Sequence, residues 1–220
     1  MKEPSGARAR PVPALLATVL AACLFGGGSC GSTSPSPSPS PSASPSASPS
    51  PSPTPITCTG TPSTYARTVS EWWVPRCSLD HNLFNDPQTA IGPPDAAGVG
   101  PEGYTGFISL GFGGRVTLDL GGCLNDRPGN DLRVFQAVSS EPVTVYVSPA
   151  PDGPYTMLEG RKRCGERING VQGYCDFDFA SGKVSQARHV RVEDGEIFPC
   201  PGGTRSEGAD LDAVQVLGSQ

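Results

Sequence analysis

The chain has 220 residues, among them 28 glycines and 25 prolines, and carries a formal net charge of −5. This much glycine and proline disfavours long helices, and the acidic balance repels phosphate backbones, which argues against nucleic acid as a partner. Eight cysteines without a Cys-x-x-Cys pair indicate disulfides formed in an oxidising compartment, not a metal-binding cytosolic protein.

Residues 1–22 have the pattern of a secretory signal peptide. Basic residues predominate up to Pro11, and the apolar run Val12–Val19 that follows is too short to span a bilayer. The string Leu20-Ala21-Ala22-Cys23 resembles the bacterial lipobox, which implies cleavage before Cys23 and attachment of lipid to that cysteine. We therefore expect an exported protein of the cell envelope, held to a bacterial membrane by a lipid anchor.

Cys30 is a rival lipidation site. Gly27 stands where a lipobox normally has leucine, and this favours Cys23. Lipidation of Cys30 after loss of Cys23 would, however, leave an even set of six cysteines. An ordinary cleaved leader without lipid is the third alternative.

Residues 23–57 are predicted to be a disordered linker. From Ser34 to Pro55 the chain is almost entirely Ser and Pro with a little Ala and Thr, so it has nothing to bury and lacks an amide donor at many positions. A spacer is the favoured interpretation. The alternative is a PxxP-type ligand, but flanking basic residues that would give specificity are missing.

Residues 58–220 predict one all-β domain. Apolar and polar residues alternate with period two, as in half-buried strands, and turn signals such as Pro151-Asp152-Gly153-Pro154 separate the runs. About nine short strands without a convincing helix indicate a two-sheet antiparallel β-sandwich of jelly-roll type. The candidate strands contain Ala66–Val74, Phe107–Leu110, Val116–Leu120, Leu132–Ala137, Val143–Val147, Tyr155–Leu158, Cys175–Phe179, Val190–Val192 and Leu211–Leu217.

Six cysteines in this domain are disulfide candidates and allow fifteen pairings. Proximity in the chain favours Cys58 with Cys77 and Cys164 with Cys175, which leaves Cys123 with Cys200. Such bridges typically contribute about 2 to 4 kcal/mol each by restricting the unfolded chain.

Six sequence blocks, taken in order, resemble an exported bacterial β-sandwich domain of the galactose-binding-like or discoidin-like group. The resemblance spans roughly Tyr65 to Leu217 and implies a secreted or surface-attached binding module, often for glycans and often with a structural calcium ion. The blocks are Ala90–Asp95, Ser109–Gly114, Arg127–Phe135, Val145–Ser148 with Asp152-Gly153, Ala187–Val192 and Asp210–Val214.

Four aspartates within these blocks are candidate Ca²⁺ ligands: Asp95, Asp131, Asp210 and Asp212. Related sandwiches bring the early Pro-Asp loop near the last strand, and oxygen ligands from separated loops suit Ca²⁺. The alternative is that these side chains cap turns by accepting hydrogen bonds from backbone amides. The family pattern has an acid after Val-Phe, where this chain has the neutral Gln136.

Candidate ligand-binding residues are aromatic. Trp72 and Trp73 are adjacent, so in a strand one points into the core and the other outward. Tyr104 and Phe107 lie in or beside a glycine-rich loop, and loops often supply ligand contacts. Core or edge packing is the alternative for all four. The basic run Arg161–Arg163 is interpreted as a solvated hairpin loop, with contact to an acidic glycan or phospholipid as its alternative.

No catalytic function is predicted. The two histidines, His81 and His189, are not accompanied by a Gly-x-Ser-x-Gly or His-Glu-x-x-His motif. The sequence therefore favours a membrane-tethered binding module for a glycan or envelope component. The alternatives are a structural or assembly lipoprotein with a protein partner and, third, a hydrolase that uses a carboxylate pair.

Overall fold

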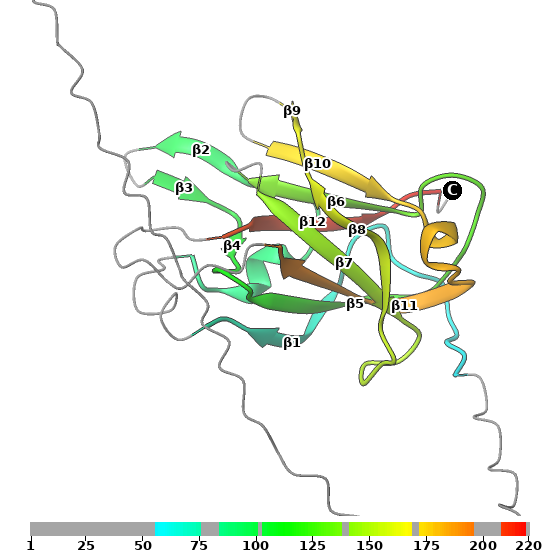
Figure 1. Cartoon of the computed structure of the whole chain (residues 1–220). Coiled ribbons are helices and arrows are strands. Elements are labelled where there is room, and N and C mark those ends of the chain that lie inside the picture. Colours follow the sequence, from blue (N-terminus) through cyan, green and yellow to red (C-terminus); the bar gives the residue numbers. More distant parts are fainter. Residues whose placement is uncertain are drawn as a thin grey trace, which may run out of the picture. The chain divides into compact units, whose positions relative to one another are not determined.

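The computed structural model describes residues 56–75, 84–100, 103–137, 141–168, 172–195 and 208–218, without the side chains of residues 98–104, 166–168 and 172. These residues form β-strands and two short 3-10 helices (Figure 1). The strands are β1 (Thr68–Trp73), β2 (Ala97–Gly100), β3 (Gly103–Thr105), β4 (Ile108–Ser109), β5 (Arg115–Asn125), β6 (Leu132–Ala137), β7 (Pro142–Ser148), β8 (Thr156–Arg163), β9 (Glu166–Ile168), β10 (Gln172–Phe177), β11 (Gln186–Asp194) and β12 (Asp210–Val216). The helices are η1 (Pro87–Ala90) and η2 (Phe179–Gly182).

Two five-stranded antiparallel sheets form a sandwich, which confirms the predicted fold class. Sheet I has the strand order β1-β5-β11-β7-β8, and sheet II has the order β4-β12-β6-β10-β9. The strands β2 and β3 form a separate hairpin (Figure 1).

The period-two pattern explains how the sandwich is filled. In β5 the apolar residues Val116, Leu118 and Leu120 are fully buried, while Arg115, which precedes them, and Asp119, between Leu118 and Leu120, stay partly exposed. Inward-facing residues of both sheets, with Phe177 and Phe179, make one continuous core. Burying an aliphatic or aromatic side chain contributes about 1.5 to 3 kcal/mol, so this alternation is enough to determine which face of the segment Val116–Leu120 points inward.

Three segments differ from the predicted strands. Arg161–Arg163 belongs to β8, not to a hairpin loop, because Lys162 and Arg163 pair with Val143 and Pro142 of β7. Strand β10 ends at Phe177, and Phe179 begins η2 because Asp178 caps this helix by accepting a hydrogen bond from the Ala180 N–H. The glycine-rich segment Gly98–Gly106, predicted to be a loop, contains most of the hairpin β2–β3.

Two disulfides join described residues. The predicted bridge Cys164–Cys175 is confirmed. The predicted pairs Cys58–Cys77 and Cys123–Cys200 are wrong, since Cys58 is bonded to Cys123. Proximity in the chain fails here because β5 lies beside the segment that precedes β1, where the Cys123 N–H donates to the Gly60 carbonyl at 2.9 Å.

Several sequence predictions fall outside the described residues. These are the signal peptide, the lipidation candidates Cys23 and Cys30, the Ser/Pro-rich tract up to Pro55, His81, and the cysteines Cys77 and Cys200. Within the described ranges, no helix has the length and apolar character needed to cross a membrane.

Candidate functional site

A hollow of about 500 Å³ lies on the outer face of sheet I, and polar side chains from three neighbouring strands meet in it. Asp119 comes from β5, which lies between β1 and β11, Ser70 comes from β1, and Arg188 and His189 come from β11. The volume is within the range of pockets that bind small ligands. We call this site the sheet I hollow.

Irregular strand pairing concentrates these polar groups. In β1, Ser70 is an extra residue between Val69, which pairs with Leu118, and Glu71, which pairs with Thr117. A β-bulge of this kind breaks the strict alternation of faces and re-aims side chains. Both Ser70 and Glu71 therefore belong to the outer face, while Val69 packs against the core.

A second irregularity lies on the other side of Asp119. The register between β11 and β5 shifts between Ala187 and His189. Arg188 and His189, although adjacent in sequence, both line the hollow, while Ala187 and Val190 stay in the core. Asp119 is thus flanked on both sides by strands that place an additional polar side chain on the outer face.

Asp119 and Arg188 form a two-point ion pair. Arg188 donates from Nε to Asp119 Oδ1 and from Nη2 to Oδ2, each at 2.8 Å. The Gly121 N–H also donates to Oδ1 at 2.7 Å. The hydrogen bond from Arg188 is the main reason that the pKa of Asp119 lies below its usual value, so this carboxylate is ionised at neutral pH.

Ser70 and His189 contact each other beside this pair. The Ser70 hydroxyl lies 3.4 Å from His189 Nδ1. Only 5% of His189 is exposed, and burial lowers the pKa of its imidazole, with Arg188 acting in the same direction and Asp119 and Asp152 opposing it. His189 is therefore neutral at pH 7 and presents one nitrogen donor and one nitrogen acceptor.

Two chain segments build the walls of the hollow. Pro149, Ala150 and Pro151 follow β7, and residues 56–59 enter from the N-terminal side. The disulfide from Cys58 to Cys123 fixes this second wall to β5. The backbone of β5 lies very close to that of Thr61 here. A side-chain carbon at Gly122 would lie only 2.1 Å from the Thr61 carbonyl oxygen, so this position requires glycine.

A candidate metal centre lies elsewhere, where β5 leads into β6 and β10 leads into η2. Carboxylate oxygens of Asp126, Asp131 and Asp178 lie within 4.8 Å of one another. Asp131 is fully buried and accepts hydrogen bonds from the Phe179 N–H at 2.8 Å and from the Arg127 N–H at 3.2 Å. Burial is the main reason that the pKa of Asp131 is raised, and the two neighbouring carboxylates raise it further. Three such carboxylates can hold a divalent cation such as Ca²⁺.

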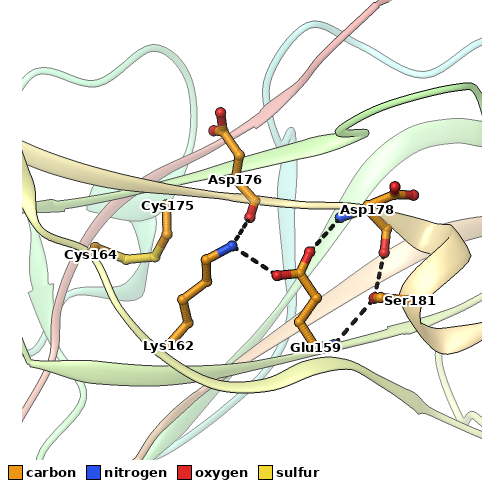
Figure 2. A network of polar contacts seen from close by, with 7 residues as sticks. All are labelled: Glu159, Lys162, Cys164, Cys175, Asp176, Asp178 and Ser181. Atoms are coloured by element: carbon orange, nitrogen blue, oxygen red, sulfur yellow. Dashed lines mark hydrogen bonds and ion pairs between the residues drawn. A yellow bond between two sulfur atoms is a disulfide. The ribbon is translucent and has the colours of Figure 1, made fainter.

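The backbone around Asp178 is held by a network that spans β8, β10 and η2 (Figure 2). Glu159 accepts hydrogen bonds from the Asp178 N–H at 3.1 Å and from Lys162 Nζ at 2.8 Å. Ser181 donates to the Asp178 carbonyl at 2.6 Å and accepts from the Glu159 N–H at 3.2 Å. Lys162 also donates to the Asp176 carbonyl at 2.6 Å. This network positions the Asp178 carboxylate beside Asp131.

The four aspartates predicted as calcium ligands do not form one cluster. Asp131 joins Asp126 and Asp178, whereas Asp95, Asp210 and Asp212 belong to no group of three among the described residues. Asp212 is buried and accepts from the N–H groups of Asp95 at 3.1 Å and Ala96. Asp210 accepts a hydrogen bond from the Ser109 hydroxyl. The contacts of Asp212 are the backbone-amide hydrogen bonds that the sequence offered as the alternative, whereas the contact of Asp210 comes from a side-chain hydroxyl.

The four predicted aromatic residues lie in different surroundings. Trp72 packs against the core and Trp73 is 47% exposed, as the alternation predicted. Phe107 is only 2% exposed, and its ring stacks on Phe84 with centroids 4.5 Å apart, so it packs and does not present a face to a ligand. Tyr104 is part of β3, and its side chain lies outside the described part of the chain.

Sequence reasoning missed Asp119, Arg188 and Ser70 in the hollow, and Asp126 and Asp178 in the acidic cluster. One signal was present. Gly121-Gly122 interrupts an otherwise regular strand pattern, and glycines within strands often mark bulges or close backbone approach. The pairing partners that bring Arg188 to Asp119 could not be identified from one sequence.

Comparison with known proteins gives little beyond this geometry. No protein-family model and no curated protein matches the chain. Among solved structures, the chain is similar to the CBM32 of AlyQ in complex with 4,5-unsaturated mannuronic acid, at 13% sequence identity and a TM-score of 0.34, over 69% of this chain and 92% of that chain.

Proposed function

We propose that this chain is a lipid-anchored extracytoplasmic module that binds a glycan of the cell envelope through the sheet I hollow. The observation that carries the proposal is the convergence of Asp119, Arg188, His189 and Ser70 in one hollow with a proline-containing wall. A few oriented polar groups beside an apolar wall are typical of small-ligand sites.

The hydrogen-bonding capacity of the hollow suits a polyol. A carboxylate has about four acceptor positions and a guanidinium five donors. Within the described residues, Asp119 uses three acceptor positions and Arg188 uses two donors. The unused donors and acceptor, with the second nitrogen of His189 and the Ser70 hydroxyl, can bond neighbouring sugar hydroxyls. The Arg188 pair holds these planar groups in place before a ligand arrives, which reduces the entropy cost of binding.

Calcium is proposed as a structural ion held by Asp126, Asp131 and Asp178. The donor set fits, because it consists of carboxylate oxygens and one of them is buried with a raised pKa. The ion would neutralise charge at the junction of β5, β6 and η2 and would stabilise the fold. It takes no part in ligand binding.

Export and lipid attachment complete the proposal. The two disulfides suit an extracytoplasmic location. The lipobox-like Leu20–Cys23, with Cys30 as the alternative acceptor, and the Ser/Pro-rich linker would place the domain away from a membrane. Mass spectrometry of the protein extracted from membranes would identify the lipidated cysteine.

The binding test uses the full chain purified in detergent, applied to an array of neutral and acidic oligosaccharides and to envelope polysaccharide extracts. The matched variants are Arg188→Gln and Arg133→Gln. Arg133 forms an equivalent two-point pair with Asp176 on sheet II, at 2.7 and 2.9 Å. We expect Arg188→Gln to lose glycan retention and Arg133→Gln to keep it. Failure to retain any glycan, with or without calcium, would rule out the proposed function.

A further inference from the structure

The outer face of sheet I continues beyond the hollow as a row of charged and aromatic side chains. Glu71 occupies its centre and accepts from Arg115 Nη2 at 2.8 Å and from Arg191 Nη2 at 2.9 Å. The Arg115 guanidinium lies over the ring of Trp73, 5.4 Å from its centroid. The Arg191 guanidinium lies over the ring of Tyr155 at 3.9 Å. We call these five residues the sheet I row.

Strand pairing places the row directly beside the hollow. Arg115 and Asp119 lie on the same face of β5, and Trp73 pairs with Arg115. Four residues of strand correspond to about 13 Å, which is longer than one sugar ring. At the near end the Tyr155 hydroxyl donates to the carbonyl of Pro151, a residue of the hollow wall, at 2.8 Å. The row and the hollow thus form one continuous polar surface that ends at Trp73.

The charges on this surface are balanced. Glu71 lies between Arg115 and Arg191, Asp119 is paired with Arg188, and Glu193 pairs in register with Arg115. An acidic ligand would have to compete with these carboxylates for the arginines. A neutral polyhydroxyl ligand can instead bond to the unused donors and acceptors without separating an ion pair.

The aromatic end of the row is accessible. Trp73 is one of three large apolar side chains that are highly exposed among the described residues, at 47%. Its ring is held by Arg115 on β5, and an exposed aromatic ring offers an apolar face on which the C–H face of a sugar can stack.

We infer that the ligand is a neutral oligosaccharide of several sugar units, with one unit in the sheet I hollow and a distal unit stacked on Trp73. This inference rests on the proposed function and adds the ligand's length, its charge and a second contact point. Arg115 and Glu71 position the Trp73 ring and hydrogen-bond the units between.

The test measures binding of the full chain to neutral gluco-, manno-, galacto- and xylo-oligosaccharides by calorimetry, from the monosaccharide to the hexasaccharide. We expect affinity to rise with length. Trp73→Ala should weaken hexasaccharide binding roughly fivefold, the ratio that corresponds to about 1 kcal/mol of stacking, and leave monosaccharide binding unchanged. Trp73→Phe should restore most of the loss. Met157→Ala is the control, because Met157 is similarly exposed, at 49%, and lies outside the row.

The outcomes separate the two proposals. Binding that does not increase with length, or that Trp73→Ala weakens equally for all lengths or not at all, overturns the extended site while leaving the hollow intact. Tighter binding of acidic oligosaccharides than of neutral ones overturns the assigned ligand class. Binding of no oligosaccharide overturns the proposed function and this inference with it.

Discussion

Asp119 on β5 and Arg188 on β11 are joined by two hydrogen bonds of 2.8 Å at a point where the pairing of their strands is irregular. In regular pairing, Arg188 and His189 would lie on opposite faces of the sheet. The irregularity places both on the outer face, with Asp119 between β11 and the bulge of β1. Bulges are enriched next to functional sites, which agrees with a binding role for this part of sheet I.

The Asp119–Arg188 pair is predicted to contribute little to stability. Arg188 keeps 39% of its side chain exposed, and ion pairs near solvent contribute about 0 to 1 kcal/mol. Arg188→Gln should therefore lower the free energy of unfolding by less than about 1 kcal/mol in a urea titration. A larger loss would mean that the pair is a structural element, and loss of glycan retention by this variant would then be uninformative.

His189 is predicted to make the domain less stable in mild acid. Burial lowers the pKa of His189 in the folded protein below 6.5, its value in the unfolded chain. At pH values between the folded and the unfolded pKa, the unfolded chain therefore binds more protons than the folded one. Stability is then complete above about pH 6.5 and falls as the pH decreases below it, by at most about 1.4 kcal/mol per pH unit. Asp119 contributes in a different range, because its pKa lies below 3.8.

Urea titrations at several values of pH between neutral and mildly acidic conditions test this prediction. His189→Gln should reduce the change in the free energy of unfolding with pH below about pH 6.5. Direct NMR titration of the imidazole should give a pKa below 6.5. If the free energy of unfolding of the variant changes with pH as steeply as that of the original protein, a titratable group other than His189 causes the effect.

The sequence was sufficient where one local pattern determines the outcome. Alternation at Val116, Leu118 and Leu120 predicted both the strand and its inward face, and the same rule separated Trp72 from Trp73. The sheet I hollow and the acidic cluster could not be predicted from this alternation. Arg188 and His189 share a face only because the register shifts.

The acidic cluster shows the same limit in a different form. Asp131 was predicted as a metal ligand, but its partners Asp126 and Asp178 were not. Asp131 lies near Asp178 because β6 pairs with β10, and the Asp131 backbone N–H donates to the Phe177 carbonyl at 2.8 Å. Asp126 follows β5 of the other sheet, and its N–H donates to the Ser185 carbonyl at 2.9 Å. Which strands pair within a sheet depends on the whole chain, and it cannot be predicted from a local sequence pattern.

Calcium is predicted to raise the melting temperature. Burial raises the pKa of Asp131, so the ionised group opposes folding as the pH rises through its folded pKa, and a bound cation would relieve this effect. At a calcium concentration one hundred times Kd, the gain is about 2.7 kcal/mol, or roughly 5 to 10 °C. Calorimetry with calcium and then with EDTA measures it.

Asp126→Asn is the variant for this test, because Asp126 is exposed and its replacement should leave the fold intact. We expect it to remove most of the calcium-dependent shift. Asp152→Asn is the control, since Asp152 is an exposed aspartate outside the cluster. Equal calcium shifts in all three proteins would place the ion elsewhere or show that none binds.

The two disulfides are predicted to differ in their effect on the sheet I hollow. Replacing Cys58 and Cys123 by serine opens a bridge that spans 65 residues of sequence, and replacing Cys164 and Cys175 opens one that spans 11. The chain-entropy model gives losses of about 4 and about 3 kcal/mol respectively. Only the first pair holds a wall of the hollow.

The pKa of the His189 imidazole, which is lowered by burial, should therefore shift toward 6.5 in the Cys58/Cys123 variant and stay unchanged in the Cys164/Cys175 variant. An NMR titration of both folded variants decides the point without a ligand: an equal shift in the two would mean that the wall formed by residues 56–59 does not bury His189.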